Sequence, residues 1–459
     1  MDRLAHVDFR LAATGDSRVK RVAVIGAGWS GLACALELVD QGVHATLLDA
    51  APQVGGRARR VDVALGDRVF PLDNGQHILL GGCVETLRLM QRAGIDFQSA
   101  VSRQPFELRY ADGFRLAAWR FPAPLHLAFG LLFARGLSWR DRVAMVRWVQ
   151  RQQLAKWLID GDRPAARLFA DQPAALVDRI WEPLCLAALN VRLVEASAQI
   201  FLNVLRDSVG ANAAASDLLL VRTDLSALFP EAAVSMIQRL GGSVRLRTDV
   251  DVLERASHAG WRVVARDFSL EVDAVVLALP PPRAKALLDS AGDGALAPAL
   301  AQLGALSMAP IATVYLRYAA PLVLPAPFLA LREDPARQDF GQWIFDRWAF
   351  DTRCACVASV VVSGDGPHMQ LTQEELARSV ERQLSEQLGL PASAARETIT
   401  EKRATIVPRP GLARPPTRLP CSGLYLAGDA AESPYPSTIE GSVRSGIAAA
   451  GALLHDIKI

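Results

Sequence analysis

The chain has 459 residues, of which 51% are hydrophobic and 21% charged, and its net charge is +2. A chain of this length exceeds one ordinary hydrophobic core, so we expect two domains, or one nucleotide-binding domain with a large insertion. The nearly neutral charge gives no reason to expect a nucleic-acid partner. The six cysteines lack the spacing of a zinc site or a redox pair, so we expect reduced thiols and no bound metal.

The start of the chain does not have the pattern of a targeting segment. Residues 1–18 carry three aspartates among the basic residues and no long apolar run, so we expect a flexible lead-in and no secretory signal. No run of 18 apolar residues follows, which argues against a membrane-spanning helix.

Residues 21–36 predict a strand, a glycine-rich turn and a helix, and a second strand ends at Asp49. This order is typical of a unit that binds a dinucleotide. Gly26 permits the turn, Gly28 permits close approach of the backbone to a diphosphate, and Gly31 permits packing of the helix on the strand. Asp49 is placed to accept hydrogen bonds from the ribose hydroxyls.

A second glycine pair follows the acidic strand end, at Gly55 and Gly56, with Arg57 next to it. These residues can reach the same diphosphate, and nicotinamide dehydrogenases usually lack them. The pattern resembles the FAD-binding amine oxidase and phytoene desaturase superfamily, in which Gly-Gly-Arg after the acid is a flavin signature. The resemblance implies FAD as the cofactor.

The superfamily resemblance implies an α/β fold: a discontinuous Rossmann-like FAD-binding domain with an inserted α+β substrate domain. Three segments fit the FAD-binding domain, namely residues 19–82, 229–288 and 400–459. The second of them contains short alternating strands and a buried strand stopped by prolines. Residues 83–228 and 289–399 would form the lipid-binding substrate domain. No second glycine fingerprint marks a nicotinamide domain, so NADPH docking transiently or a partner reductase would supply electrons.

Residues 72–82 place polar side chains where the superfamily brings the chain across the flavin ring. Asn74, Gly75 and Gln76 are expected to touch the flavin. His77 suits proton transfer near neutral pH, and a purely structural histidine explains it as well. The sequence leaves both alternatives open.

The last segment carries a strand that ends in Gly428-Asp429 and then a helix rich in alanine. The superfamily assigns this aspartate to the ribityl or diphosphate part of FAD. Ser437 with Glu440 three residues later predicts a capping box that opens the helix. A helix N-terminus facing the flavin would stabilise the anionic reduced ring.

Residues 181–190 and 401–406, with the Asp-Asn-Gly-Gln-His run, resemble the squalene-associated FAD-dependent desaturase group, to which hydroxysqualene dehydroxylase activity is assigned. The resemblance extends from about residue 20 to the end. Val191 and Asp49 depart from the residues expected there. The resemblance implies FAD contacts from Gly26, Gly28, Trp29, Ser30, Gly31, Asp49, Ala50, Gly55, Gly56, Arg57, Asn74, Gly75, Gln76, Val250, Gly428, Asp429, Ser437, Thr438 and Ile439.

The implied reaction is reductive dehydroxylation of hydroxysqualene to squalene, in squalene and hopanoid biosynthesis, with hydride from reduced flavin. It requires a dry apolar tunnel and an acid for the hydroxyl group. His77 is the first candidate for the acid, followed by Asp73 and Tyr435. The alternatives are a carotenoid-type desaturase, which moves hydride the other way, and a non-catalytic isoprenoid-binding membrane scaffold.

Residues 121–134 are apolar and aromatic, and arginines follow them. The segment is too short to cross a bilayer, and it fits either an interfacial segment or a buried helix of the substrate domain. With an apolar isoprenoid substrate, we expect a cytoplasmic protein bound peripherally to the inner face of the membrane.

Overall fold

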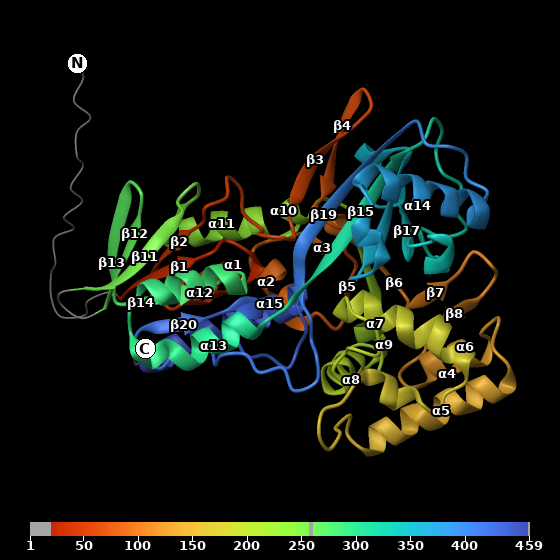
Figure 1. Ribbon diagram of the computed structural model, residues 1–459, viewed down its shortest axis with the longest axis horizontal. Coiled ribbons are helices and arrows are strands. Elements are labelled where there is room, and N and C mark those ends of the chain that lie inside the picture. The colour runs from red at the N-terminus through yellow and green to blue at the C-terminus, as the bar shows by residue number, and fades with distance from the viewer. Residues whose placement is uncertain (1–19, 257–259, 458–459) are drawn as a thin grey trace.

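The computed structural model describes residues 20–256 and 260–457 (Figure 1). The flexible lead-in predicted for residues 1–18 lies outside the described residues. A parallel sheet lies at one end of the molecule, an antiparallel sheet beside it, and a group of helices at the other end.

The parallel sheet has five strands in the order β10-β2-β1-β14-β20. Each of its pairs is parallel. The strands span Arg21–Ile25 (β1), His44–Leu48 (β2), Ser243–Arg245 (β10), Ala274–Leu277 (β14) and Leu424–Leu426 (β20). They therefore come from all three segments predicted for the FAD-binding domain, and the mixed α/β class with a Rossmann-like sheet is confirmed.

Both faces of the parallel sheet are covered by other elements. Because side chains alternate along each strand, successive residues pack on opposite faces. Val22 and Val24 of β1 pack with α1 (Trp29–Asp40), α11 (Pro230–Arg239) and α15 (Ile439–Asp456). Ala23 and Ile25 pack on the other side, where the covering elements are α12 (Pro281–Ser290), α13 (Ala297–Ala305) and the small sheet of β11 (Val250–Arg255), β12 (Trp261–Ala265) and β13 (Phe268–Val272).

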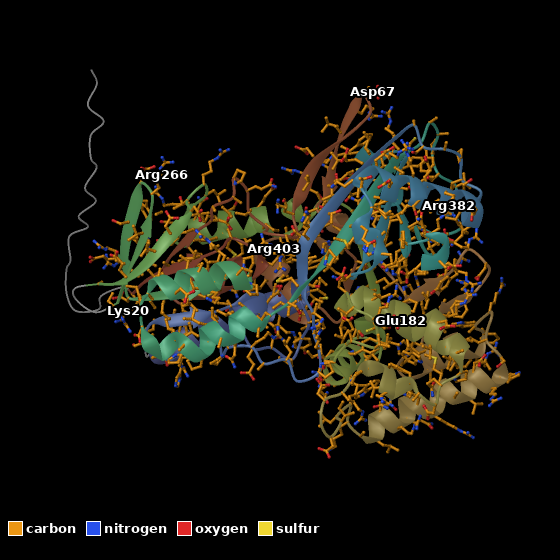
Figure 2. The ribbon with its side chains drawn as sticks, in the orientation of Figure 1. Lys20, Asp67, Glu182, Arg266, Arg382 and Arg403 are labelled. Carbon is orange, nitrogen blue, oxygen red and sulfur yellow. The ribbon has the colours of Figure 1, made fainter. Side chains whose placement is uncertain are left out.

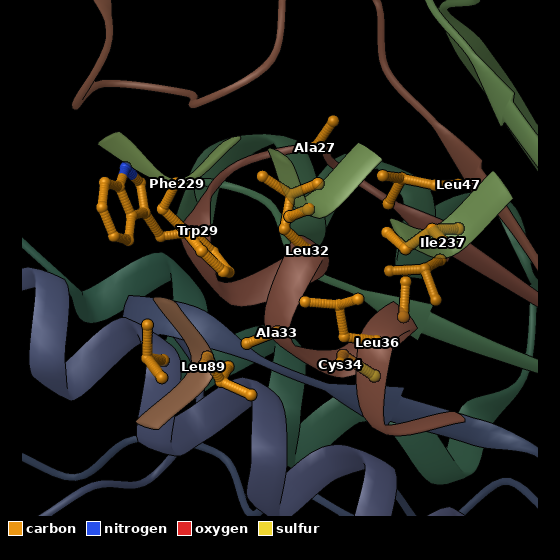
Figure 3. Close-up of a cluster of buried hydrophobic side chains, with 14 of the residues drawn as sticks. Ala27, Trp29, Leu32, Ala33, Cys34, Leu36, Leu47, Leu89, Phe229 and Ile237 are labelled. Carbon is orange, nitrogen blue, oxygen red and sulfur yellow. The ribbon is translucent and has the colours of Figure 1, made fainter. Parts of the chain in front are cut away.

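Figure 3 shows the centre of the first face, where α1 presents Leu32 and Leu36 to the sheet. Trp29 at the start of α1 contacts Phe229, with ring centroids 5.0 Å apart. Ten of the twelve residues of α1 are buried. This packing fixes the position of the helix N-terminus relative to β1.

The antiparallel sheet has the order β16-β17-β18-β15-β19. Its strands span Met308–Arg317 (β15), Phe328–Ala330 (β16), Trp343–Asp346 (β17), Val357–Ser363 (β18) and Ala395–Ile406 (β19). Helix α14 (Gln373–Leu388) covers the face that carries Ala312, Val314 and Val360. The predicted boundary at residue 400 falls inside β19, so residues 400–406 belong to this sheet and the segment of the parallel sheet begins after them.

Helices form most of the first insertion, and an aromatic cluster holds them together. Trp148 contacts Trp181 and Phe169 with ring centroids 4.7 and 5.0 Å away. None of the helices in the described part of the chain has both the length and the apolar character needed to cross a bilayer. The remaining elements are β3 (Arg60–Leu65), β4 (Arg68–Asp73), β5 (Leu79–Leu80), α2 (Val84–Arg92), α3 (Phe97–Ala100), β6 (Val101–Gln104), β7 (Glu107–Arg109), β8 (Arg115–Ala117), α4 (Leu125–Leu132), α5 (Trp139–Leu154), α6 (Ala174–Leu176), α7 (Glu182–Leu189), α8 (Ala198–Asp207), α9 (Ala213–Ser216), β9 (Leu218–Val221) and α10 (Leu225–Leu228).

Candidate functional site

The three glycines of the first turn have different surroundings. Gly26 has φ +109°, and a Cβ there would lie 2.2 Å from the Ala278 carbonyl oxygen. A Cβ on Gly31 would lie 1.8 Å from the Gly26 carbonyl oxygen, so this glycine is required for packing. A Cβ on Gly28 would have only the Gly56 Cα within 4 Å, at 3.8 Å. Gly28 therefore faces open space at the N-terminus of α1, as a diphosphate cradle requires.

The second glycine pair lies directly beside the first turn. Gly28 and Gly55 form a parallel bridge, and the Gly55 N–H donates to the Ala27 carbonyl oxygen at 2.8 Å. Gly55 and Gly56 have φ values of +106° and +62°, a region that favours glycine. The structure thus brings together the two glycine motifs that the sequence placed in one site.

Trp29 and Ser30 open helix α1 and have different environments. The Trp29 indole donates to the Ala58 carbonyl oxygen at 2.9 Å, which ties the helix to the second glycine segment. The Ser30 hydroxyl is buried and has no hydrogen-bond partner among the described residues. It lies 3.5 Å from the position of a Cβ on Gly428. A buried hydroxyl without a partner beside a helix N-terminus fits a phosphate ligand.

Asp49 stands at the carboxyl end of β2, where its carboxylate is half-buried. It accepts from the backbone N–H groups of Ala27 at 2.5 Å and Ala51 at 2.7 Å. A carboxylate accepts about four hydrogen bonds. These two bonds therefore orient Asp49 and leave acceptor capacity for ribose hydroxyls, while its neighbour Ala50 is exposed.

Arg57 and Asp429, which are 372 residues apart, form an ion pair with a nitrogen–oxygen distance of 2.6 Å. Arg57 also donates to the Ala404 carbonyl oxygen at 2.5 Å and accepts from Asn74 through its own carbonyl oxygen at 3.0 Å. Figure 2 shows the neighbouring Arg403 at the junction of the two sheets. Arg57, Asn74 and Asp429, three of the residues predicted to contact FAD, therefore lie close together at this junction.

A buried polar cluster lies next to this junction, on the face of the antiparallel sheet opposite α14. We define the polar cluster as Asp73, Gln76, His77, Thr313, Arg347 and Ser359. Arg347 is 2% exposed and donates to Gln76 Oε1 at 2.6 Å, which also accepts from Ser359 at 3.1 Å. Thr313 Oγ1 and two guanidinium nitrogens of Arg347 are buried and have no hydrogen-bond partner among the described residues.

Sequence reasoning missed Arg347. It is one of many arginines, and no motif surrounds it. Its importance comes from a contact with Gln76, 271 residues away, and from complete burial. No signal in its own sequence neighbourhood marks either property.

Asp73 is a buried carboxyl group whose pKa lies near neutral pH. Burial raises the pKa of this carboxyl to about 7, although the nearby positive charge of Arg347 opposes the shift. The Arg347 nitrogen lies 3.8 Å from Asp73 Oδ2, too far for a hydrogen bond, so desolvation dominates. Oδ1 accepts from the Leu225 N–H at 2.8 Å, which leaves Oδ2 to carry the proton.

His77 is set up as a neutral side chain. Its Nδ1 lies 2.7 Å from the Gly75 carbonyl oxygen, so this nitrogen carries the hydrogen and Nε2 is an acceptor. Burial lowers the pKa of the imidazole. His77 is therefore a weaker candidate for the acid than Asp73.

Tyr435 uses its hydroxyl group in a hydrogen bond to the Asp207 carboxylate. The guanidinium of Arg444 lies over its ring, 4.7 Å from the centroid. Burial and the Asp207 carboxylate raise the pKa of the phenol. The phenol proton is thus committed to Asp207.

The predicted capping box at the start of α15 is wrong by one residue. Thr438 is the N-cap, and its hydroxyl accepts from the Gly441 N–H at 3.0 Å, so Ile439 is the first helical residue. Ser437 accepts instead from the Ile406 N–H at the end of β19, at 3.0 Å. Glu440 accepts from the hydroxyl and backbone N–H of Thr86. The Ser437 hydroxyl therefore does not cap α15, because it accepts a hydrogen bond from a strand that is distant in sequence.

Val250 begins β11 and is 2% exposed. Its carbonyl oxygen accepts from Arg283 at 2.8 Å, and a β-bulge follows it. The preceding turn lies near the carboxyl end of β2, where the Arg247 N–H donates to the Ala51 carbonyl oxygen. The predicted cofactor contact of Val250 stays a prediction.

A glycine cradle at a helix N-terminus, an acid at the end of the next strand and a third segment closing the site define a dinucleotide-binding protein. The chain belongs to the flavin-containing amine oxidoreductases, whose family profile matches residues 29–454. It is an FAD-dependent oxidoreductase.

Within this family the chain is similar to hydroxysqualene dehydroxylases and to a zeta-carotene desaturase. It is 31% identical to the hydroxysqualene dehydroxylase of Rhodopseudomonas palustris, over 95% of this chain and 98% of the relative. It is 28% identical to the hydroxysqualene dehydroxylase of Sinorhizobium fredii, over 95% and 99%. The zeta-carotene desaturase of Zea mays is 23% identical, over 93% of this chain and 82% of the relative.

Solved structures support the fold. An oxidoreductase from Methanosarcina mazei superposes with a TM-score of 0.71 at 16% identity, covering 93% of this chain and 99% of that chain. The cyclohexylamine oxidase of Brevibacterium oxydans gives a TM-score of 0.69 at 18% identity, covering 96% and 100%.

Proposed function

We propose that the chain reduces hydroxysqualene to squalene. The carbon–oxygen bond breaks, the oxygen leaves as water, and a carbon–hydrogen bond forms with a hydride and its electron pair. The observation that carries the proposal is the polar cluster, which holds a carboxyl with a pKa of about 7 beside an apolar wall. That wall contains Phe345, Phe350 and Trp343. The near full-length similarity to two hydroxysqualene dehydroxylases supports it.

The FAD cradle follows from the site residues. The α1 N-terminus, with Gly28, Ser30 and Gly56, would hold the diphosphate, since Gly28 faces open space, Gly56 lies against it, and the Ser30 hydroxyl has no hydrogen-bond partner among the described residues. Asp49 would accept from the ribose, and Arg57 with Asp429 would line the part toward the flavin. Reduced FAD, when bound, supplies the hydride.

Asp73 is the acid in this proposal. Its Oδ2 donates the proton to the departing hydroxyl group, because Oδ1 is occupied by the Leu225 N–H. Arg347 donates a hydrogen bond to Gln76, and its positive charge limits how far the pKa of Asp73 rises. The acid preferred from the sequence, His77, accepts a hydrogen bond at Nε2 and helps to place the substrate hydroxyl.

The apolar wall has a chemical task as well. Loss of an allylic hydroxyl leaves a delocalised cation, which water would trap and return to an alcohol. Phe328, Phe345 and Phe350 belong to one cluster with helices of the first insertion, and this cluster keeps water from the cation. The polyene chain fits such a surface through dispersion and burial.

The test is a product analysis with FAD-loaded protein under anaerobic conditions. Reduced with dithionite and incubated with hydroxysqualene, the protein should form squalene, detected by mass spectrometry. An Asp73→Asn variant with a normal flavin spectrum lacks the proposed acid and should form squalene at least about 100-fold more slowly. Absence of squalene from the wild-type reaction would contradict the proposal.

The second candidate is a desaturase, favoured by the similarity to zeta-carotene desaturase. A desaturase would oxidise phytoene or zeta-carotene in the presence of a quinone and extend its conjugation. The visible spectrum of the extracted pigment reports this directly. A folded protein that takes up no FAD would instead indicate a non-catalytic isoprenoid carrier.

A further inference from the structure

Exposed apolar side chains are concentrated in one stretch of the first insertion. Of the 17 large hydrophobic side chains that are exposed in the described residues, eight lie within residues 119–146. We call these eight the apolar face. They are Trp119, Phe121, Leu125, Leu132, Phe133, Trp139, Val143 and Val146. Scattered exposed hydrophobics are ordinary, whereas a concentrated set marks an interaction site.

The aromatic rings of this face are in contact with one another. Trp119 stacks on Phe133 with centroids 5.0 Å apart and on Phe121 with centroids 6.1 Å apart. Phe129 lies 5.0 Å from Phe121 and completes the group. Trp119 is 44% exposed and Phe133 is 58% exposed. The rings therefore form a packed group on the surface and do not fill the core.

The opposite side of α4 explains why these rings point outward. A Cβ on Gly130 would lie 2.5 Å from the Ala117 carbonyl oxygen, so the helix sits tightly on the end of β8. Leu131 is buried and belongs to the same cluster as Phe328 and Phe345 of the proposed substrate wall. The inward side of α4 is thus filled, and the outward side has no partner in the described chain.

The same stretch is strongly basic. Residues 119–151 contain six arginines and one aspartate, which gives +5, whereas the whole chain carries +2. The arginines are Arg120, Arg135, Arg140, Arg142, Arg147 and Arg151. Arg142 stacks on Trp139 at 4.9 Å, and Asp141 is engaged in the capping box of Ser138. In Figure 1, α4 and α5 lie at the end of the molecule away from the parallel sheet.

We propose that the apolar face docks on a bilayer that contains anionic lipids. Exposed tryptophan and phenylalanine suit the headgroup boundary, and the surrounding arginines suit phosphate groups. A symmetric dimer through this face would set two arginine-rich surfaces against each other, which disfavours a second copy of the chain. The inference extends the proposed function, because the bilayer is where a substrate of that class dissolves.

The test uses the full-length, FAD-loaded protein and extruded vesicles. The protein should sediment with vesicles that contain phosphatidylglycerol and less with pure phosphatidylcholine, and added salt should weaken the binding. Combined Trp119→Ser, Phe133→Ser and Trp139→Ser substitutions should lower the partition coefficient at least about 10-fold. The matched control is Val69→Ser, Leu240→Ser and Val323→Ser, which removes side chains that are 66%, 44% and 91% exposed elsewhere.

Failure of the wild type to bind phosphatidylglycerol vesicles overturns the proposal. It is also overturned if the triple variant binds like the wild type, if the control loses as much binding, or if the triple substitution only changes the oligomeric state in light scattering. Squalene formation from detergent-dispersed substrate should be unchanged in the triple variant. Its absence in the wild type would count against the proposed function alone, since vesicle binding needs no substrate.

Discussion

At the scale of single residues, Asp73 links burial to a pH dependence. Its folded pKa, about 7, lies above the ordinary value of 3.8, so the native state binds more protons between these two values. Its contribution to stability therefore decreases as the pH rises through that window. If the protonated carboxyl is the acid, squalene formation should be constant at lower pH and fall above about pH 7.

The pH profile of single-turnover squalene formation checks this. Asp73→Asn should remove the falling limb together with most of the activity. Asp224→Asn is the control, because the negative charge of Asp224 helps to raise the pKa of Asp73. That variant should keep activity and move the midpoint to lower pH. An unchanged profile in Asp73→Asn would exclude this carboxyl.

Arg347 gives a second prediction at the residue scale. Replacing it with methionine removes the charged donor to Gln76 and leaves only Ser359 bonded to that amide oxygen, which should lower the free energy of unfolding by about 2 kcal/mol. The falling limb of the pH profile should also move upward, since a charge that lowers the pKa of Asp73 is gone.

Urea unfolding and the pH profile together test Arg347→Met. Arg151→Met is the control, because Arg151 and Asp171 form an exposed ion pair with side chains 54% and 56% accessible. Its loss should cost less than about 1 kcal/mol. Equal costs for the two variants, or an unmoved pH midpoint in Arg347→Met, would argue against the role assigned to Arg347.

At the scale of elements, α15 depends on Thr438 for its first turn. Thr438→Ala removes the acceptor of the Gly441 N–H and should destabilise the protein by about 1 kcal/mol. Ser442→Ala, inside the same helix, should be neutral or slightly stabilising, since alanine favours helices. Urea unfolding measures both, and a flavin spectrum reports whether the helix still borders the cofactor. A neutral Thr438→Ala would place the cap elsewhere.

At the scale of the whole molecule, local patterns were predictable and long-range partners were not. The roles of Gly26 and Gly31 follow from backbone geometry within one turn, and the structure confirms the requirement for glycine. The cap was misplaced because Ser437 binds Ile406, 31 residues away. Arg347 and the Tyr435–Asp207 pair were beyond prediction, since each depends on a contact more than 200 residues apart. The sequence left open whether residues 121–134 are exposed or buried, and only the tertiary structure shows which side chains around α4 are exposed.

The parallel sheet joins three distant segments, and FAD would bridge them at the carboxyl ends of β1, β2 and β20. A ligand that binds only the native state stabilises it, by about 4 kcal/mol at 1,000 times its dissociation constant. Adding FAD to protein freed of flavin should therefore raise the melting temperature by several degrees in scanning calorimetry. Gly28→Ala should melt like the flavin-free wild type, because its Cβ meets only the Gly56 Cα at 3.8 Å, yet it should gain little from FAD. Gly451→Ala, whose Cβ meets nothing within 4 Å, should respond to FAD as the wild type does. A full FAD response in Gly28→Ala would move the diphosphate away from this glycine cradle.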